Sequence, residues 1–412
     1  MKANILKNQP KCLVCNSKIF SIYNFGKIPL VNSFSKKFSI SNKKFLLNLC
    51  VCKNCKICQL SNTPDEKKIY SNYKHSSSDS IDNLNHLKNL STFLKKKFKK
   101  QNRILEVGCN DGSLLHLLKN KFKYLYGIDP AKNFKRKHKN INNIMYDFFD
   151  KNIKKKIVKK FNIDKFDLIL GLNVFAHFKD IQNAFIQIHD LLNDNGKFIF
   201  EVAYSADSLF SGKFDTVYHE HVFNHSLTGI KYMLNKAKLN VQSIKKVKTQ
   251  GGSIRVIAGK KKANNSEIKK IISTENKNMN LNKIKFYKKF SLKLKKQIEF
   301  INKIIKKLTI SNEPIVLVGA PARGVIFVNS TNLKNYKNFL IVDDSIAKKN
   351  CYFPGLKNKI SDWKVLKKNT IKYKTAILLS WNYKDTMIRK LIQNKFKGHL
   401  HLFFPNYKKI TI

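Results

Sequence analysis

Short apolar runs separated by polar turns fill the middle of the chain and predict an α/β fold. The clearest unit runs from Arg103 to Asp129. A short apolar strand leads through a loop containing Gly108 and Gly112 into a stretch with leucines at helical spacing. A second strand, 124–128, then ends in Asp129. Strand, loop, helix, strand and terminal acid form one unit of a doubly wound α/β sheet.

The same pattern continues to about residue 262. Apolar runs predict further strands at 141–145, 166–171 and 197–202, and the middle one is continuously apolar, as buried parallel strands are. A helix is expected at 181–192, with a stop at Asn193–Gly196. These elements extend the sheet and complete one α/β domain.

A second α/β unit is expected at residues 311–412. Pro314–Gly324 has the pattern of a strand, a small-residue turn and a helix, and apolar runs at 339–342 and 376–379 predict two more strands. Between the two units, residues 263–310 are rich in Lys, Asn and Ile, with isoleucines at helical spacing. We interpret this stretch as a packed helical connector.

Basic residues outnumber acidic ones by 81 to 26, which gives a formal net charge of +55. Such a charge usually favours nucleic acid or an anionic membrane. However, only five of the basic residues are arginines, and the lysines are spread over nearly every expected helix. Phosphate-reading sites more often use arginine forks in one patch. We therefore interpret the charge as a solvated lysine surface that would still attract an anionic, nucleotide-linked substrate.

No apolar run of 18 residues occurs, and the N-terminus lacks the apolar core of a signal peptide. We expect a cytoplasmic protein without a membrane span. Six of the eight cysteines precede residue 60, and in a reducing compartment this clustering favours metal over disulfides. Two C-x-x-C pairs predict a structural Cys₄ zinc site, with Cys50 and Cys58 as alternative ligands near the second pair. The expected ligands are Cys12, Cys15, Cys52 and Cys55.

The first glycine loop indicates the kind of cofactor. Glycines let a ligand approach the backbone, the helix start offers free N–H groups, and a strand-terminal acid can bind ribose hydroxyls. The spacing departs from the G-x-G-x-x-G of dinucleotide sites, and the neighbouring acids suit the amino group and sulfonium of S-adenosylmethionine. Phenylalanine after the third strand would stack on adenine. The expected cofactor-binding residues are Glu106, Gly108, Asn110, Asp111, Gly112, Asp129, Phe148 and Asn173.

Polar side chains gather after the strands whose carboxyl ends would form the mouth of this site. His177 follows the fourth strand, and Tyr218, His219, Glu220 and His221 follow the fifth. Histidine is the commonest general base near neutral pH. A surface loop with incidental histidines and a metal site at His219 and His221 are the alternatives.

These motifs, in this order, resemble the sugar C-methyltransferase family of deoxysugar biosynthesis over almost the whole chain. The family has an N-terminal zinc-binding domain, a central class I S-adenosylmethionine-dependent Rossmann-like domain and a second, C-terminal Rossmann-like domain. The expected boundaries are 1–80 for the zinc domain and lid loop, 81–262, a connector at 263–310, and 311–412. The stretches that carry the resemblance are Cys12–Cys15, Cys52–Leu60, Glu106–Gly112, Asn173–His177, Tyr218–His221, Gly251–Arg255, Gly319–Gly324 and Trp381–Asn382.

The resemblance implies methyl transfer to a ring carbon, typically C3, of a nucleotide-linked 4-keto-6-deoxy sugar. His221 would be the base, with Glu220 and Tyr218 orienting it or relaying protons. His177 would polarise the keto group, and Tyr73 of the lid loop would contact the sugar. Two positions depart from the family pattern: His75 stands in the lid loop where a second tyrosine is usual, and Gln250 replaces a common histidine.

The C-terminal unit and one arginine of the central domain are expected to hold the rest of the substrate. Arg255 is a candidate for an anionic substrate group, because arginines are rare in this chain. The resemblance assigns the nucleotide diphosphate to the turn after the first C-terminal strand and to a Trp-Asn pair. The expected substrate-binding residues are Arg255, Ala320, Arg323, Trp381 and Asn382.

Two other classes of function compete with this reading. A zinc-containing RNA methyltransferase would explain the charge, but the chain has no basic stripe interleaved with aromatic residues for stacking bases. A non-enzymatic zinc-ribbon adaptor for nucleic acid would require a degenerate cofactor site. We expect a small-molecule partner, no nucleic acid, no membrane and a monomer.

Overall fold

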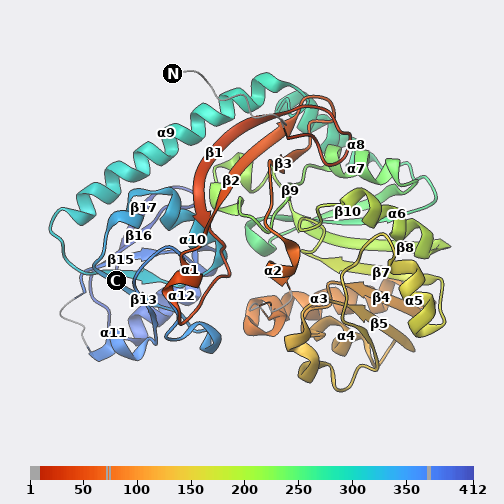
Figure 1. Ribbon diagram of the computed structural model, residues 1–412, viewed down its shortest axis with the longest axis horizontal. Helices are drawn as coiled ribbons and strands as arrows, with labels where there is room; N and C mark the ends of the chain where they lie inside the picture. The colour runs from red at the N-terminus through yellow and green to blue at the C-terminus, as the bar shows by residue number, and fades with distance from the viewer. Residues whose placement is uncertain (1–9, 71–72, 74–75, 369–372) are drawn as a thin grey trace. The chain divides into compact units, whose positions relative to one another are not determined.

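The computed structural model describes residues 10–70, 73, 76–368 and 373–412 (Figure 1), so His75 lies outside the described residues. The chain divides into two compact units. The first comprises Met1–Phe20, Val51–Asp207 and Val222–Phe286, and the second comprises Ser21–Cys50, Ser208–His221 and Tyr287–Ile412.

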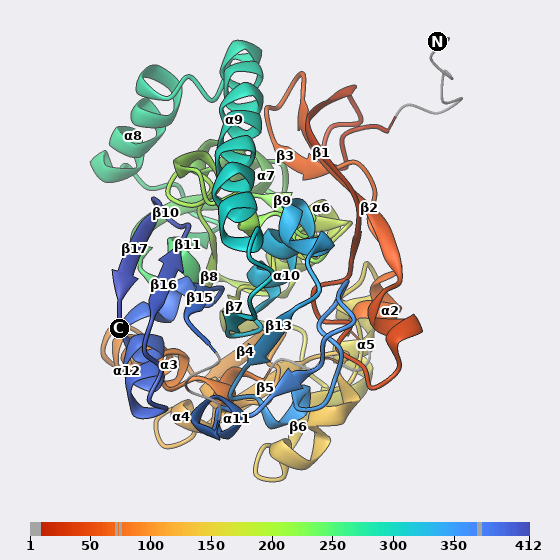
Figure 2. The same ribbon diagram turned by 90° about the vertical axis from the view of Figure 1, so that its left-hand side faces the viewer.

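A seven-stranded sheet forms the centre of the first unit, in the order β10-β11-β8-β7-β4-β5-β6, and all seven strands are labelled in Figure 2. Neighbours from β8 to β6 are parallel, whereas β11 pairs antiparallel with both β8 and β10. The chain therefore reverses its direction of winding between β4 and β7, which is where doubly wound sheets bind ligands. The strands are β4 (Arg103–Val107), β5 (Tyr124–Ile128), β6 (Asn143–Met145), β7 (Phe166–Leu172), β8 (Leu192–Ala203), β10 (Asn240–Val247) and β11 (Ser253–Gly259).

Helices of the first unit begin at capping side chains and bury one apolar stripe. The Ser80 and Asp180 side chains accept hydrogen bonds from backbone N–H groups of the first turns that follow them. Buried leucines at positions 87, 90 and 94 form the inner stripe of the longest of these helices. The helices are α2 (Glu66–Tyr70), α3 (Ile81–Lys97), α4 (Ser113–Leu118), α5 (Ile153–Phe161), α6 (Ile181–Leu191), α7 (Leu227–Lys236) and α8 (Ser266–Ser273).

The second unit contains another doubly wound sheet, in the order β14-β13-β12-β15-β16-β17, with β17 as an antiparallel edge. Figure 2 labels four of its strands, β13, β15, β16 and β17. Most of the 26-residue helix α9 (Ile284–Thr309) belongs to this unit, and its buried residues recur at helical spacing. The other elements are β12 (Ile315–Val318), β13 (Phe339–Val342), β14 (Ile360–Ser361), β15 (Thr375–Leu378), β16 (His399–Leu402), β17 (Lys408–Thr411), α10 (Ala322–Ser330), α11 (Lys364–Lys368) and α12 (Lys384–Gln393).

Four short or curved strands complete the chain. β1 (Ile19–Pro29) and β2 (Lys44–Cys52) are neighbours and lie mainly in the second unit, together with α1 (Phe38–Ser41). β3 (Cys58–Leu60) and β9 (Phe223–Asn224) pair antiparallel in the first unit. Among the described residues, no helix has the length and apolar character needed to cross a membrane.

The two sheets and their helices confirm the α/β fold class. The helix ends where the sequence predicts, since α6 stops at Leu191 and Leu192 is already extended. Residues 193–196 interrupt the regular pairing of β8, because Leu192 lies opposite Phe166 and the next pair joins Lys197 to Leu168. A Cβ atom at Gly196 would lie 2.8 Å from Leu192 Cγ, so the close approach within this turn explains the glycine.

Candidate functional site

The loop after β4 turns sharply at residues with left-handed backbone conformations. Gly108, Asn110 and Gly112 have φ angles of 69°, 50° and 77°. A Cβ atom at Gly108 would lie 2.7 Å from a Val174 methyl group. Glycine is thus required at this turn by the fold itself, and the turn also leaves backbone exposed to a ligand.

Asp129, at the end of β5, is fixed against this loop. Its Oδ2 accepts a hydrogen bond of 2.8 Å from Asn110 N, and its Oδ1 accepts one of the same length from Ala131 N. His138 Nε2 lies 2.8 Å from the Asn110 carbonyl oxygen and can donate to it. Burial raises the pKa of Asp129 even though both backbone hydrogen bonds favour the ionised form.

Glu106 is a buried acid inside β4. Burial is the main cause that raises its pKa, followed by the nearby Asp111 and Asp129. Its Oε2 atom has no hydrogen-bond partner among the described residues. A buried carboxyl oxygen without a partner is costly, so a ligand that brings donors or positive charge would stabilise it. The amino group and sulfonium of S-adenosylmethionine have that character. The buried carboxyl group of Glu106 therefore fits this cofactor.

Asp111, also expected to bind cofactor, uses its carboxylate inside the protein. Oδ2 accepts from Ser76 Oγ at 2.5 Å and from Ser78 N at 2.9 Å, and Oδ1 accepts from Ser113 Oγ at 2.6 Å and from Ser113 N at 3.1 Å. These hydrogen bonds hold its pKa well below the usual range. Asp111 thus joins the segment before α3 to the cofactor loop.

Phe148 and Asn173 follow the ends of two strands in the same sheet. Phe148 is half-buried after β6, while its neighbour Phe149 is buried against Phe178. Asn173 follows β7 with a left-handed φ of 55°, and its N–H donates to the Glu201 carbonyl at 2.8 Å. Apart from Glu106 inside β4, the cofactor-binding candidates therefore lie after the carboxyl ends of β4, β5, β6 and β7.

Arg255 lies in β11 and is buried beside Glu201. Its Nε and Nη2 each lie 2.6 Å from Glu201 Oε1, and His86 Nε2 lies 2.7 Å from Glu201 Oε2. Phe93 covers the guanidinium at 5.3 Å. This arrangement favours a structural role for Arg255 over the expected contact with substrate, because the carboxylate already pairs with it.

His177 lies in an aromatic group of the first unit. Its ring stacks on Tyr70 with centroids 5.5 Å apart, and Tyr70 in turn lies 5.8 Å from Tyr73. Burial, and then the neighbouring His225, lower the pKa of His177 to about 4. His177 is consequently neutral at pH 7 and able to donate or accept a hydrogen bond.

The Tyr218–His221 segment belongs to the second unit, where two groups fix the imidazole of His221. Nδ1 lies 3.0 Å from the Thr216 carbonyl, to which it can only donate, and Nε2 lies 2.6 Å from the Tyr218 hydroxyl. Burial, and then Glu220, raise the pKa of Tyr218, so its phenol stays protonated and donates. His221 is thereby held as the tautomer whose Nε2 carries the lone pair.

The remaining polar residues of this segment have separate partners. Glu220 Oε1 accepts from Asn32 Nδ2 at 2.8 Å. His219 Nε2 donates to the Phe45 carbonyl at 3.1 Å, and burial lowers the pKa of His219. His219 and His221 contact different backbone carbonyls, and they form no metal-ligand group with other described residues.

The turn after β12 repeats the geometry of the first loop. Ala320 N donates to Asp343 Oδ2 at 2.6 Å, and Gly319 has a φ of 86°. Arg323 is buried at the start of α10, with its guanidinium 5.2 Å from the Trp381 ring centre. Asn382 follows Trp381 in a short 3-10 helix.

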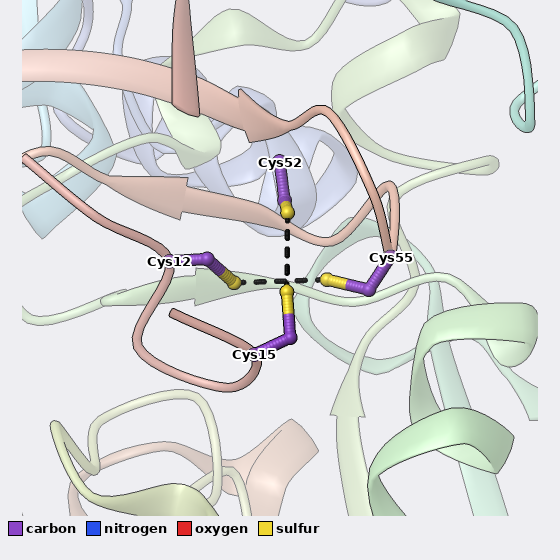
Figure 3. Close-up of side chains that lie close together, drawn as sticks. All are labelled: Cys12, Cys15, Cys52 and Cys55. Atoms are coloured by element: carbon purple, nitrogen blue, oxygen red, sulfur yellow. Dashed lines mark hydrogen bonds between the residues drawn. The ribbon is translucent and has the colours of Figure 1, made fainter. Parts of the chain in front are cut away.

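Four cysteine sulfurs of the first unit lie within 4.8 Å of one another and point toward a common centre (Figure 3). The Sγ atoms of Cys12 and Cys55 are 3.6 Å apart and those of Cys15 and Cys52 are 3.4 Å apart, near the edge of about 3.8 Å expected for tetrahedral zinc. In each knuckle, a backbone N–H two residues on donates to the first sulfur. This set fits a structural zinc ion.

Cys50 and Cys58 are not members of this group. Burial raises the pKa of Cys50 to about 12, and its thiol donates to the Asn48 carbonyl instead. The structure therefore selects the pair Cys52 and Cys55 from the overlapping C-x-x-C motifs, which the spacing alone left open.

Four partners of the site residues were missed from the sequence. Ser76 and Ser78 hold Asp111, His86 holds Glu201, and Asp215 holds Trp381 through a hydrogen bond of 2.6 Å. The two serines lie in the stretch that the sequence predicts as part of the zinc domain and lid loop, and no local pattern indicates that they contact Asp111. An acid such as Glu201 within an apolar strand does signal a buried partner, but not which residue provides it.

Comparisons with known proteins agree with this geometry. A family profile described as a methyltransferase domain matches residues 82–244, and one described as the C-methyltransferase C-terminal domain matches residues 248–404. These two domains, one after the other along the chain, show an S-adenosylmethionine-dependent C-methyltransferase. Among curated proteins, it is similar to the C-methyltransferase NovU of Streptomyces niveus, with 22% identity over 395 residues and 93% of each chain covered.

Solved methyltransferase structures resemble less than half of the chain. An S-adenosylmethionine-dependent methyltransferase from Clostridium acetobutylicum shares 17% identity with a TM-score of 0.35, covering 44% of this chain and 93% of the other. The N-methyltransferase NodS from Bradyrhizobium japonicum shares 17% identity with a TM-score of 0.33, covering 42% and 94%.

Proposed function

We propose that this C-methyltransferase methylates the ring carbon beside the ketone of a nucleotide-linked 4-keto-deoxysugar. The expected ring carbon is C3. The observation that supports this proposal best is the fixed tautomer of His221, since removal of a proton from carbon needs a neutral, oriented base. S-adenosylmethionine, when bound, supplies an electrophilic methyl group.

In the proposed mechanism, the proton of the carbon beside the ketone moves to His221 Nε2, directly or through the Tyr218 hydroxyl. The C–H electron pair becomes that of an enolate, whose carbon would be the nucleophile toward the methyl group that bound S-adenosylmethionine would supply. The resulting imidazolium is stabilised by the Thr216 carbonyl at Nδ1. Neutral His177 donates a hydrogen bond to the enolate oxygen, and Tyr73 contacts the sugar.

Binding roles follow from the same proposal. Glu106, Asp129, Phe148 and Asn173 bind S-adenosylmethionine together with the glycine loop, Gly108–Gly112. The nucleotide diphosphate is bound by Ala320, Arg323, Trp381 and Asn382. The substrate is therefore a small molecule, and no nucleic acid is needed.

Proton exchange at the acidic carbon tests the proposal separately from methyl transfer. The enzyme is incubated in D₂O with thymidine diphosphate-4-keto-6-deoxyglucose without cofactor, and deuterium at C3 is followed by NMR. We expect exchange by the wild type and a loss of about 100-fold or more in His221→Gln. His189→Gln, in a half-buried histidine of α6, is the control.

Three results would contradict the proposal. Normal exchange in His221→Gln would show that His221 is not the base. Exchange by the wild type at a carbon other than C3 would show that another ring carbon is methylated. Methyl transfer to RNA, without proton exchange on the sugar nucleotide, would show that the substrate is RNA and not a nucleotide-linked sugar.

A further inference from the structure

Asp215 is a buried carboxylate to which the proposed chemistry gives no role. Its side chain is 1% exposed in the 3-10 helix Phe214–Thr216 of the second unit. Oδ2 accepts the indole N–H of Trp381 at 2.6 Å, and Oδ1 has no hydrogen-bond partner among the described residues. Burying an acid in this way is costly, so its partner Trp381, in the short 3-10 helix that follows β15, is the first clue to its purpose.

Trp381 is the residue through which Asp215 meets the proposed nucleotide site. The Arg323 guanidinium lies 5.2 Å from the centre of the indole ring, and the Lys213 ammonium lies 5.8 Å from it. These distances are within the range of cation–π attraction. A nucleotide diphosphate bound to Arg323 would therefore act on the position of the indole that Asp215 holds.

The next residue along the chain holds the proposed base. The Thr216 carbonyl accepts from His221 Nδ1 at 3.0 Å, and Phe214, on the other side of Asp215, is fully buried against Phe404 with centroids 5.3 Å apart. Three consecutive residues of one helical turn are thus anchored to the core, to Trp381 and to His221. One helical turn therefore connects Trp381 to His221 through two hydrogen bonds.

We propose that Asp215 is a positioning residue that couples nucleotide binding at Trp381 and Arg323 to the orientation of His221. The inference rests on the proposed function and deepens it. Binding energy from the non-reacting nucleotide would be used to align the base, so that the nucleotide raises kcat for proton removal and not only affinity. A purely structural Asp215 would instead affect every substrate equally.

The test compares two substrates in the cofactor-free exchange reaction. One is thymidine diphosphate-4-keto-6-deoxyglucose, and the other is the same keto sugar as its 1-phosphate, which lacks the nucleoside. In the wild type, we expect kcat for exchange to be higher with the complete substrate. In Asp215→Asn, we expect that advantage to shrink about tenfold or more, while kcat for the sugar phosphate stays the same.

Two further variants make the result specific. Trp381→Phe keeps an aromatic ring but removes the N–H donor, and it should also reduce the nucleotide advantage. Asp362→Asn changes a partly exposed aspartate of the same unit and should leave both substrates unaffected. Trp363→Phe leaves Trp381 as the single tryptophan, so its fluorescence reports directly whether thymidine diphosphate binds.

Equal losses for both substrates in Asp215→Asn would show a structural role and overturn the coupling. An unchanged ratio of the two kcat values in both Asp215→Asn and Trp381→Phe would also overturn it. Failure of the wild type to bind thymidine diphosphate and to exchange either sugar would instead remove the proposed function, and the inference with it. The wild-type measurements therefore separate the two kinds of failure.

Discussion

His225 is buried in the first unit, and its Nε2 can donate a hydrogen bond to the Phe175 carbonyl oxygen at 3.2 Å. His401 is similarly buried in the second unit, with Nδ1 3.0 Å from the Tyr407 hydroxyl. Burial lowers the pKa of each to about 4, below the ordinary value of 6.5. At the scale of single residues, burial thus keeps these histidines neutral, and protonating them opposes folding.

Stability should therefore depend on pH in a defined direction. Between pH 6.5 and 4, the unfolded chain binds protons at these histidines that the native protein does not bind. The free energy of unfolding should fall as pH decreases through this window. Because carboxylates titrate as well, the measurement is the difference between variants in urea unfolding at pH 7.5 and pH 5. His225→Gln should reduce the loss, whereas His189→Gln should not; equal losses would contradict this account.

The cofactor loop is held in place by elements outside its own strand and helix. Ser76 Oγ donates to Asp111 and also lies 2.6 Å from Lys137 Nζ, which donates to it. Ser78 reaches Asp111 with its backbone N–H. At the scale of elements, the segment before α3 is therefore joined to the loop between β4 and α4.

Removing one of these hydrogen bonds should weaken cofactor binding. Ser76→Ala removes a donor to a carboxylate, which is worth roughly 1.5–3 kcal/mol in general. We expect the Kd for S-adenosylhomocysteine, measured by calorimetry, to rise about tenfold. Ser78→Ala keeps the backbone donor and serves as the matched control, with a smaller rise. An unchanged Kd in Ser76→Ala would show that the segment before α3 does not affect cofactor binding.

The zinc knuckles give a second prediction at the scale of elements. Purified protein should contain one zinc ion per chain by mass spectrometry. Cys12→Ser and Cys52→Ser should lose the metal and lower the unfolding temperature, because the ion cross-links two distant turns. Cys50→Ser and Cys58→Ser should keep it. Loss of zinc in Cys50→Ser but not in Cys52→Ser would reverse the ligand assignment.

Across the whole molecule, the two units use the same turn. Gly108 N donates to the Ile128 carbonyl and Gly319 N donates to the Val342 carbonyl, both at 2.8 Å. In each unit, the acid that ends the second strand accepts a hydrogen bond from the loop after the first strand: Asp129 from Asn110 N, and Asp343 from Ala320 N. One backbone arrangement therefore prepares both units for a polar ligand at the carboxyl ends of their strands.

The net charge of +55 makes a prediction about the whole molecule. Positive charges repel one another in the compact state, and salt screens that repulsion. Raising NaCl from 50 to 500 mM should therefore raise the unfolding temperature at pH 7, as measured by calorimetry. The increase should largely vanish near pH 10, where the sequence is isoelectric. If salt raised the unfolding temperature by the same amount at both pH values, the cause would be a general salt effect and not the screening of net charge.

The sequence by itself determined the features that depend on neighbours along the chain. Apolar runs, turn residues and leucine spacing predicted the strand–loop–helix unit at Arg103–Asp129, because hydrogen bonding and burial act over a few residues there. The two C-x-x-C knuckles were also predicted from the sequence, because the two cysteines of each pair lie within one turn. The order of such motifs was enough to indicate a C-methyltransferase.

Only the tertiary structure decided which distant groups meet. It selected Cys52 over Cys50, paired Arg255 with Glu201 although the residues are 54 positions apart, and joined Asp215 to Trp381 across 166 positions. A buried charged or polar group signals in sequence that it needs a partner. The partner itself is set by strand order and helix packing, which bring together side chains that no local pattern connects.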